Sequence, residues 1–417
     1  MNIRLFPRAA LCAIALVVTG CSTTQNDSST ASTEPAITIN WLPCGPIECG
    51  SVAVPANHLT SAGPTTSLSL FRRKATVGSS PRTLVLLPDR EFGSNARELV
   101  ENSPLTLGIT IRGYDVISVA PRGSEFSPMP LGSEHLVGTY DSVNDLESVR
   151  TALNTKKVSV IGWGTGATIG TAWMVQKPSA FDVAVFDSPA DPTTSLVKQA
   201  TSHIAATALG VQTAVRWCAS HLSCPMNANV AKELNKLKTA IRLNRVAVGI
   251  TFETVSRAAL RALPNGQPQQ LFEAIADAID GDGAQLLALA GQPPTADAAL
   301  VRCADVSQKS AALIAAAHAA VVPYKFTIGA EALLFATCAN LPAAIRPLTN
   351  AENISSKVKE ARVLVTIARG DQITAPYVAR TMAKNMGWIY KSIYANRHLV
   401  VGYDQAATDA AMEFLAA

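Results

Sequence analysis

Short apolar runs alternate with segments of helical spacing between residues 66 and 191. The runs predict strands because each is short and continuous, whereas Asp141–Leu153 predicts a helix because its apolar residues recur every three or four positions. Strands that alternate with helices indicate a mostly parallel α/β sheet flanked by helices. The predicted strands are Ser67–Phe71, Thr83–Leu87, Asp115–Val119, Val158–Ile161 and Val183–Phe186.

The pattern changes over residues 193–350, which are alanine-rich with apolar positions three and four apart and few β-branched runs. That spacing predicts a stack of helices. The α/β pattern then resumes, so the helical block interrupts one core. The resumed elements are a strand at Arg362–Ile367, a helix at Pro376–Asn385, a strand at Ile389–Ile393 and a closing helix at Gln405–Ala416.

The N-terminus predicts export. Arg4 and Arg8 precede an apolar run that is too short to span a bilayer and ends in small residues, as an export signal does. The ending Val-Thr-Gly-Cys resembles the bacterial lipobox, which predicts that Cys21 is lipidated and anchors the exported chain to the cell membrane. A plain signal peptide that ends near a cysteine is the alternative. Residues 1–20 are therefore interpreted as the signal and the Ser/Thr-rich residues 21–39 as a flexible tether.

The mature chain keeps six cysteines once the signal cysteine is removed and Cys21 is lipidated. An even number in an exported chain favours disulfides over metal ligands, and no Cys-x-x-Cys motif is present. We therefore expect no metal site. Six cysteines allow 15 pairings in principle. Proximity in the sequence suggests Cys44–Cys49, Cys218–Cys224 and Cys303–Cys338.

Charge and composition argue against nucleic acid as a partner. The formal net charge is +4, and it falls to +2 when Arg4 and Arg8 leave with the signal. No basic tract or alternation of basic and aromatic residues is present.

The most informative motif runs from Val158 to Gly170, where a strand turns into a helix. It has the form of the G-x-S-x-G nucleophile elbow, with Gly162 and Gly166 as the small flanking residues. Glycine stands at position 164, where that elbow carries its nucleophilic serine. With the helical block inserted after the fifth strand, the motif predicts an α/β-hydrolase fold: a core over 40–192 and 351–417 with a helical cap over 193–350.

The order of further motifs resembles the exported tripeptidyl-aminopeptidase-like (TAP-like) α/β hydrolases over nearly all of the mature chain. The resemblance implies a peptidase ancestry and short peptides as the class of substrate. The matching segments are Trp41–Cys44 with Glu48-Cys49 and Val54-Pro55, Gly113–Gly123, Asp145–Arg150, Phe186–Pro192, Cys303–Asp305 and Cys338–Pro342.

In that family an Asp-x-x-Thr-Pro segment supplies the catalytic acid and a later histidine supplies the base. Asp371, in Arg369–Pro376 with one extra residue, and His398 match these positions. Elbow, Asp and His follow one another in the order of the α/β-hydrolase triad. Asp371 would then hold the imidazole and His398 would act as the base. A helix-capping aspartate and a surface histidine are the structural alternatives.

Two features of the elbow's surroundings bear on the missing nucleophile. Thr165 is a poor substitute because Trp163 would then occupy a flanking position that needs a small residue. We expect Thr165 to supply the backbone N–H of the oxyanion hole instead. The second donor should come from a Gly-Gly-Pro-Gly-like loop, but this chain has Pro88–Gly93, and a carboxylate from Asp89 or Glu91 would oppose a developing oxyanion.

A dinucleotide-binding interpretation is also open. Gly162-x-Gly164-x-x-Ala167 fits the loose G-x-G-x-x-G/A fingerprint, and Asp187 ends the following strand where a ribose-binding acid could lie. The bulky Trp163 beside a pyrophosphate and the export signal argue against it. We therefore expect no cofactor.

These observations leave three functional hypotheses. The first is an exported lipoprotein whose hydrolase site is impaired and whose core–cap cleft binds a peptide, an acyl ligand or a protein partner. The second is a working peptidase or esterase in which His398–Asp371 activates water and bypasses the nucleophile. The third is a scaffold in which the cleft is unused.

Overall fold

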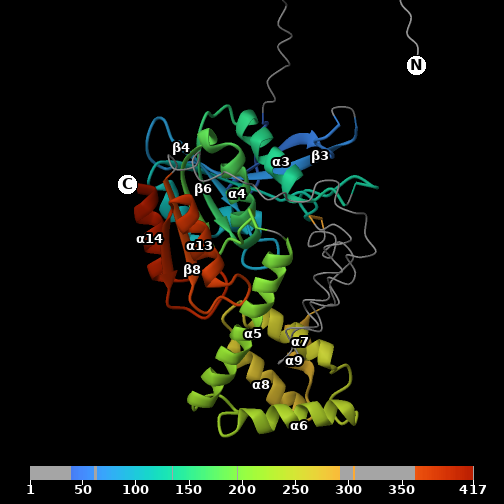
Figure 1. Cartoon of the computed structure of the whole chain (residues 1–417). Helices are drawn as coiled ribbons and strands as arrows, with labels where there is room; N and C mark the ends of the chain where they lie inside the picture. The colour runs from blue at the N-terminus through green and yellow to red at the C-terminus, as the bar shows by residue number, and fades with distance from the viewer. Residues whose placement is uncertain are drawn as a thin grey trace, which may run out of the picture. The chain divides into compact units, whose positions relative to one another are not determined.

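A computed structural model describes residues 39–60, 63–133, 135–194, 196–291, 304–305 and 362–416. Within these ranges the chain forms one 9-stranded sheet in the order β1-β2-β3-β5-β4-β6-β7-β8-β9 (Figure 1). The strands are β1 (Leu42–Pro43), β2 (Glu48–Pro55), β3 (Thr65–Arg73), β4 (Arg82–Leu87), β5 (Tyr114–Val119), β6 (Val158–Trp163), β7 (Phe181–Asp187), β8 (Arg362–Ala368) and β9 (Ile389–Ile393).

The sheet is parallel from β5 to β9 and antiparallel at the edge formed by β1, β2 and β3. Helices cover both faces of the parallel strands, so these strands are continuous apolar runs and are easy to predict from the sequence. In β2, by contrast, only Val52 and Val54 are buried and alternate with exposed neighbours. That short half-buried pattern explains why β1 and β2 were absent from the prediction.

Helices cover both faces of the sheet. Val143, Trp173 and Met382 belong to the apolar cluster on one face, whereas Leu99 and Leu415 belong to the cluster on the other. The first face carries α3 (Thr139–Ala152), α4 (Gly164–Gln176) and α13 (Pro376–Met386); the second carries α1 (Ala96–Glu101), α2 (Pro104–Thr110) and α14 (Gln405–Ala416).

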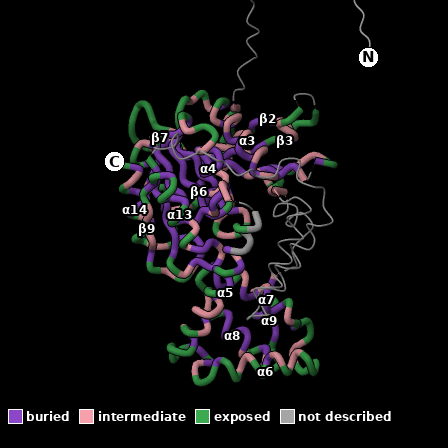
Figure 2. The backbone as a smooth tube through the Cα atoms, viewed as in Figure 1, coloured by how far each residue is buried: buried purple, intermediate pink, exposed green. Residues whose placement is uncertain are grey.

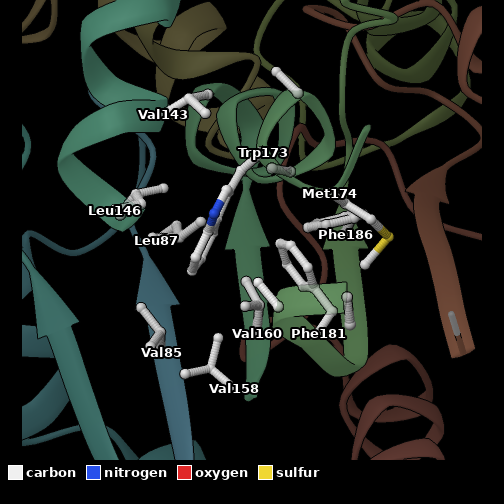
Figure 3. Close-up of a cluster of buried hydrophobic side chains, with 14 of the residues drawn as sticks. Val85, Leu87, Val143, Leu146, Val158, Val160, Trp173, Met174, Phe181 and Phe186 are labelled. Carbon is white, nitrogen blue, oxygen red and sulfur yellow. The ribbon is translucent and has the colours of Figure 1, made fainter. Parts of the chain in front are cut away.

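The core under α4 is built around an aromatic pair. Trp173 reaches from α4 toward the sheet, beside Leu87 and Phe181 (Figure 3). The rings of Trp173 and Phe181 meet edge to face with centroids 4.7 Å apart, and Trp173 is 1% exposed. Aromatic pairs of this geometry contribute roughly 0.5–1.5 kcal/mol beyond their burial. This packing fixes the direction of α4 and therefore the turn that precedes it.

Between β7 and β8 the described chain is helical, and we call this part the helical cap. Its buried residues form a third apolar cluster, while the outward sides of its helices are exposed (Figure 2). Backbone and side-chain hydrogen bonds join it to the core: Thr207 Oγ1 donates to Gln372 O, and the His398 N–H donates to Pro264 O. Its helices are α5 (Leu196–Ser220), α6 (Val230–Arg242), α7 (Phe252–Ala262), α8 (Pro268–Ile279) and α9 (Ala284–Ala290).

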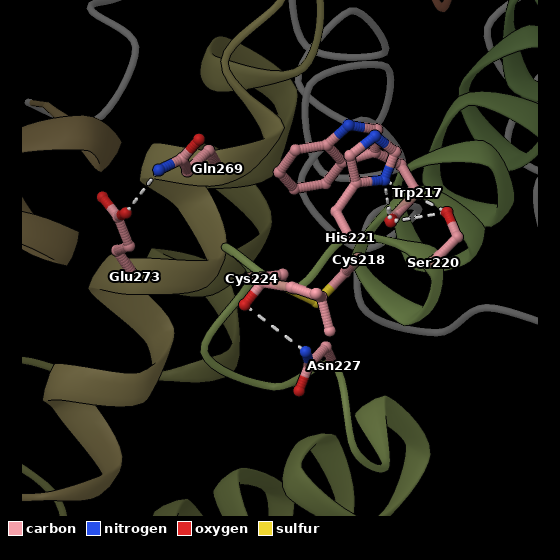
Figure 4. The surroundings of a disulfide bond; sticks show 9 residues. Trp217, Cys218, Ser220, His221, Cys224, Asn227, Gln269 and Glu273 are labelled. Carbon is pink, nitrogen blue, oxygen red and sulfur yellow. Dashed lines mark hydrogen bonds between the residues drawn. A yellow bond between two sulfur atoms is a disulfide. The ribbon is translucent and has the colours of Figure 1, made fainter.

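Two disulfides lie in the described residues, Cys44–Cys49 and Cys218–Cys224. The first closes the turn between β1 and β2, and the second ties the end of α5 to the loop before α6 (Figure 4). Cys303, Cys338 and Cys21 lie outside the described residues, as do the predicted signal and nearly all of the tether. None of the helices in the described ranges is both long and apolar enough to cross a membrane.

Candidate active site

The elbow forms where β6 turns into α4. Gly164 begins α4 with a φ of +48°, a left-handed conformation that costs other residues about 1–2 kcal/mol. A Cβ on Gly166 would lie 2.2 Å from the carbonyl oxygen of Leu87, and one on Gly162 would lie 2.7 Å from the Cα of Ala167. Both flanking glycines are therefore required by the close approach of strand and helix.

Asp371 and His398 meet at the same edge of the sheet. Asp371 follows β8 and His398 follows β9, so both lie at the carboxyl ends of neighbouring parallel strands. His398 Nδ1 lies 2.9 and 3.0 Å from the two Asp371 carboxylate oxygens, and each residue is 1% exposed. A carboxylate only accepts, so Nδ1 carries a proton. His398 is therefore not the surface histidine of the structural alternative, and the N-cap of α13 is Ala375 and not Asp371.

The Asp371 carboxylate is itself held in place. Its Oδ1 accepts the backbone N–H groups of Ile373 and Thr374, each at 2.8 Å. The Phe92 ring also packs on His398 in an edge-to-face arrangement, with centroids 5.4 Å apart. The ring is thereby fixed with Nε2 toward the elbow.

His398 holds its proton more strongly than an ordinary histidine. Burial alone would lower the pKa of His398, but the carboxylates of Asp371, Asp89 and Asp187 outweigh it and raise that pKa above 6.5. At a given pH, a smaller fraction of His398 is therefore neutral imidazole than for an ordinary histidine, and only the neutral form can act as a general base.

No side chain at the elbow tip faces this histidine. A Cβ on Gly164 would lie 2.9 Å from His398 Nε2, so the tip does point at the imidazole. The same Cβ would lie 1.9 Å from Asp89 Oδ2 and 2.8 Å from Asp89 Cγ. A carboxylate thus fills the place beside the tip, and a serine at position 164 would require Asp89 to move.

Asp89 is bound to the elbow through several hydrogen bonds. Its Oδ2 accepts the Thr165 N–H at 2.7 Å, and its Oδ1 accepts the N–H groups of Glu91 and Phe92, each at 2.7 Å. The Thr165 hydroxyl also lies 3.2 Å from Oδ2 and accepts the Arg90 N–H at 2.9 Å. The residue is 9% exposed.

This arrangement differs from the expected role of Thr165. Its N–H was expected to face a substrate oxyanion, but it donates to Asp89 instead. The sequence indicated that Asp89 or Glu91 would bring negative charge to this place. The structure shows that Asp89 does so, because its own loop turns back to bind its carboxylate.

Asp187 ends β7, the position that the dinucleotide-binding alternative required, but its carboxylate is used within the fold. It is 0% exposed, and Oδ2 accepts the N–H groups of Val400 and Val401 at 2.7 and 2.8 Å. Ser188, at a φ of +57°, donates its hydroxyl to His398 O. Burial raises the pKa of Asp187 to about 7. Its Oδ1 accepts the Thr366 hydroxyl at 3.2 Å, so Asp187 positions the His398 loop and both of its oxygens are already hydrogen-bonded within the fold.

Two motifs of the family resemblance meet in a buried ion pair. Arg122, 1% exposed, donates to both oxygens of Asp145, each at 2.6 Å, and to the carbonyls of Ala56 and Leu136. Such a fully bonded guanidinium fixes the middle of α3 against the end of β2. Asp305 binds the same region, accepting the Thr139 N–H at 2.9 Å. These groups hold the scaffold, and Arg122 and Asp145 line one pocket with Gly166 of the elbow.

A family model described as the alpha/beta hydrolase fold matches residues 93–400, which include the elbow, Asp371 and His398. The chain belongs to this family. The fold class predicted from the sequence, a mostly parallel sheet flanked by helices, is thereby confirmed. In this alpha/beta hydrolase, no group of three or more His, Cys, Asp or Glu side chains within the described ranges is placed to hold a metal ion.

Known proteins similar to this alpha/beta hydrolase include the serine protease Hip1 of Mycobacterium tuberculosis and of Mycobacterium bovis. Each is 24% identical over 359 residues, which cover 68% of this chain and 68% of Hip1. Among solved structures, the proline iminopeptidase of Mycobacterium smegmatis is 13% identical with a TM-score of 0.46, covering 88% of this chain and 96% of that one. A carboxylesterase structure from Nitrososphaera gargenis is 13% identical with a TM-score of 0.45, covering 88% and 97%.

Proposed function

We propose that this chain is an alpha/beta hydrolase that has lost serine-hydrolase chemistry and binds a peptide or acyl ligand between its core and its helical cap. One observation carries the proposal: the Asp89 carboxylate accepts the Thr165 N–H beside Gly164. Gly164 supplies no nucleophile. The Thr165 N–H, which an oxyanion would use as a donor, is already bonded to a negatively charged carboxylate.

The size of the effect supports loss of catalysis over slow catalysis by the ordinary route. Removing one oxyanion-hole donor costs roughly 2.7–4 kcal/mol of barrier, and removing a triad nucleophile leaves only residual rates. Here both changes occur together. The presence of Asp89 is worse than a missing donor, because its charge repels the charge that develops on a substrate carbonyl.

The retained Asp371–His398 pair is consistent with a binding protein. Removing one partner of a buried ion pair costs about 3–5 kcal/mol, since the other charge stays buried. Asp371 also holds the backbone of Ile373 and Thr374. The pair can therefore persist for stability after its catalytic role has ended.

A second candidate, water activation by His398, has one observation in its favour. Nε2 points at the elbow tip, 2.9 Å from where a Cβ would lie, which is the direction of a reacting centre. General-base assistance alone contributes typically 10²–10⁴-fold. The raised pKa of His398 reduces the fraction of neutral imidazole available for this reaction.

We further propose that the chain is exported and anchored by lipid on Cys21. The charged start, the short apolar run and the Val-Thr-Gly-Cys ending support this. The two disulfides fit an oxidising compartment outside the cytoplasm. The peptidase ancestry is supported by the similarity to the serine protease Hip1.

Hydrolysis of free-amino peptide anilides and short acyl esters by the purified protein tests the proposal. With either the wild type or a His398→Ala variant, the hydrolysis rate should not exceed the rate in buffer alone. Turnover by the wild type that His398→Ala removes would establish the water-activation route instead. Disulfides must be intact in both proteins, as shown by thiol titration.

A further inference from the structure

A cavity of about 310 Å³ lies between the helical cap and the loops that carry the Asp371–His398 pair. Its walls come from α5, from the turn between α7 and α8, and from the segments after β8 and β9. Neither His398 nor Asp371 lines it, but their chain neighbours Arg397 and Gln372 do. The cavity is thus separate from the disarmed centre, although it shares the same loops.

One side of the cavity is apolar and rigid. Trp217 lines it, and the ring is stacked on His221 with centroids 4.7 Å apart (Figure 4). The next residue along α5 forms the Cys218–Cys224 disulfide, which holds this end of the helix. Leu263, 4% exposed, and Pro268 complete the apolar wall. A flat ring beside aliphatic groups suits an apolar or aromatic side chain.

The other side carries polar groups with unmet hydrogen-bonding capacity. Gln372 is 4% exposed, and its Oε1 has no hydrogen-bond partner within the described part of the chain. The same holds for the buried Nε of Arg397. A buried polar atom without a partner costs about 1–3 kcal/mol, so such atoms in a cavity wall indicate a missing partner.

The positions of these two side chains are set by their neighbours. A Cβ on Gly210 would lie 2.0 Å from Gln372 Cγ, so α5 carries glycine where the glutamine crosses it. The Arg397 guanidinium lies over the Tyr403 ring at 4.5 Å. Among the described residues, no carboxylate lies within ion-pair distance of Arg397, and none lines the cavity. Arg397 therefore forms no ion pair within the described ranges, although the carboxylates of Asp187 and Asp404 act on its charge from a longer distance.

We propose that this cavity binds the C-terminal residue of a short peptide. The peptide N–H meets Gln372 Oε1, the terminal carboxylate meets Arg397, and the last side chain lies on Trp217. A C-terminal residue offers these three groups together: an N–H donor, an anionic carboxylate and, in many peptides, an apolar side chain. The inference rests on the binding role proposed above and names the part of the peptide that is recognised.

Calorimetric titration of the full-length mature protein tests the inference with an N-acetylated dipeptide ending in phenylalanine. We expect it to bind at least about tenfold more tightly than the same dipeptide with a C-terminal amide, because the charge-assisted hydrogen bond is lost. Arg397→Gln should abolish that preference, and Trp217→Ala should weaken both ligands about tenfold. Arg242→Gln, at the exposed end of α6, should change neither.

A measurement on the unmutated site covers the case in which a variant does not fold. The indole N–H signal of Trp217 in the ¹⁵N spectrum, assigned with Trp217→Phe, should shift with the acid and not with the amide. Equal affinity for acid and amide, or a preference that survives in folded Arg397→Gln, would overturn the inference. If the inference fails in this way and the wild type shows no hydrolysis, the proposed loss of catalysis is still supported. If the wild type shows His398-dependent hydrolysis, the proposed function is wrong, whatever the peptide titration shows.

Discussion

The acid–base half and the nucleophile half of the candidate site differ in how far they match a working hydrolase. The acid–base half, Asp371 and His398, keeps a buried geometry with carboxylate-to-imidazole distances of 2.9 and 3.0 Å. The nucleophile half has glycine at its tip and the Asp89 carboxylate on its oxyanion donor. The comparison teaches that the half with the catalytic geometry is also the half whose side chains hold the fold, through the hydrogen bonds of Asp371 to Ile373 and Thr374. At the φ of +48° found at the tip a serine would be strained, whereas glycine adopts this conformation at little cost.

The same contrast exists inside the elbow. Gly162 and Gly166 remain because a Cβ on either would collide with backbone. Gly164 differs, because its neighbours are the side chains of Asp89 and His398 and because its φ is +48°. The two flanking glycines are therefore explained by the packing of strand and helix. Only the residue at position 164 bears on whether the site can catalyse a reaction.

Restoring the nucleophile half should produce the largest effect. Gly164→Ser alone should stay inactive, because the new Cβ meets Asp89 Oδ2 at 1.9 Å. With Asp89→Ala in the same chain, ester hydrolysis should rise by about 10³-fold over wild type, as the hole and nucleophile return together. Burst kinetics with an acyl ester measures this. Equal activity of the single and double variants would show that Asp89 does not block the tip.

Breaking the acid–base half should cost stability. Asp371→Ala leaves the His398 imidazole buried without its carboxylate, and we expect a loss of about 3–5 kcal/mol in the free energy of unfolding. Denaturant unfolding measures it. The double variant Asp371→Ala/His398→Ala is the control and should recover part of the loss. A loss below about 1 kcal/mol would mean that the pair is not kept for stability.

Stability should fall as the pH rises. Burial raises the pKa of Asp187 from 3.8 to about 7, so the folded state binds this proton more tightly between pH 4 and 7. The raised pKa of His398 acts in the same direction above pH 6.5. For Asp187 the slope should reach at most about 1.4 kcal/mol per pH unit. Thermal unfolding at several pH values should show a flatter profile for Asp187→Asn, and an unchanged one for exposed Asp182→Asn.

The smallest effect should be the electrostatic link between the halves. The Asp89 carboxylate contributes to the raised pKa of His398. Asp89→Asn should therefore lower the pKa of His398 while keeping the side chain's size. Titration of the imidazole by NMR follows it, with Asp182→Asn as the matched control. An unchanged pKa would separate Asp89 from the imidazole electrostatically.

Sequence reasoning located the parts of the site that follow from strand order. Elbow, Asp371 and His398 come at the carboxyl ends of parallel strands, which must meet at one edge of the sheet. The charged loop after β4 was visible, but the choice between Asp89 and Glu91 depended on how that loop turns. No local pattern could show that the Asp89 carboxylate reaches the Thr165 N–H.

Other features lay beyond the sequence for a related reason. The position of Asp187 suggested a ribose-binding acid, but its bonds to Val400 and Val401 join segments more than 200 residues apart. The cavity beside Trp217 needs four separate segments to be packed before it exists. Periodicity predicts elements and their order, whereas such contacts depend on how the elements pack.

Covalent labelling with a phosphonate ester probe tests the central claim most directly, because the probe reacts only with an activated nucleophile beside a working oxyanion hole. Intact-mass spectrometry should find no adduct on the wild type or on Gly164→Ser, and one adduct at position 164 on Gly164→Ser/Asp89→Ala. Stoichiometric labelling of the wild type at any residue, removed by His398→Ala, would contradict the claim that Gly164 and Asp89 have disarmed the site.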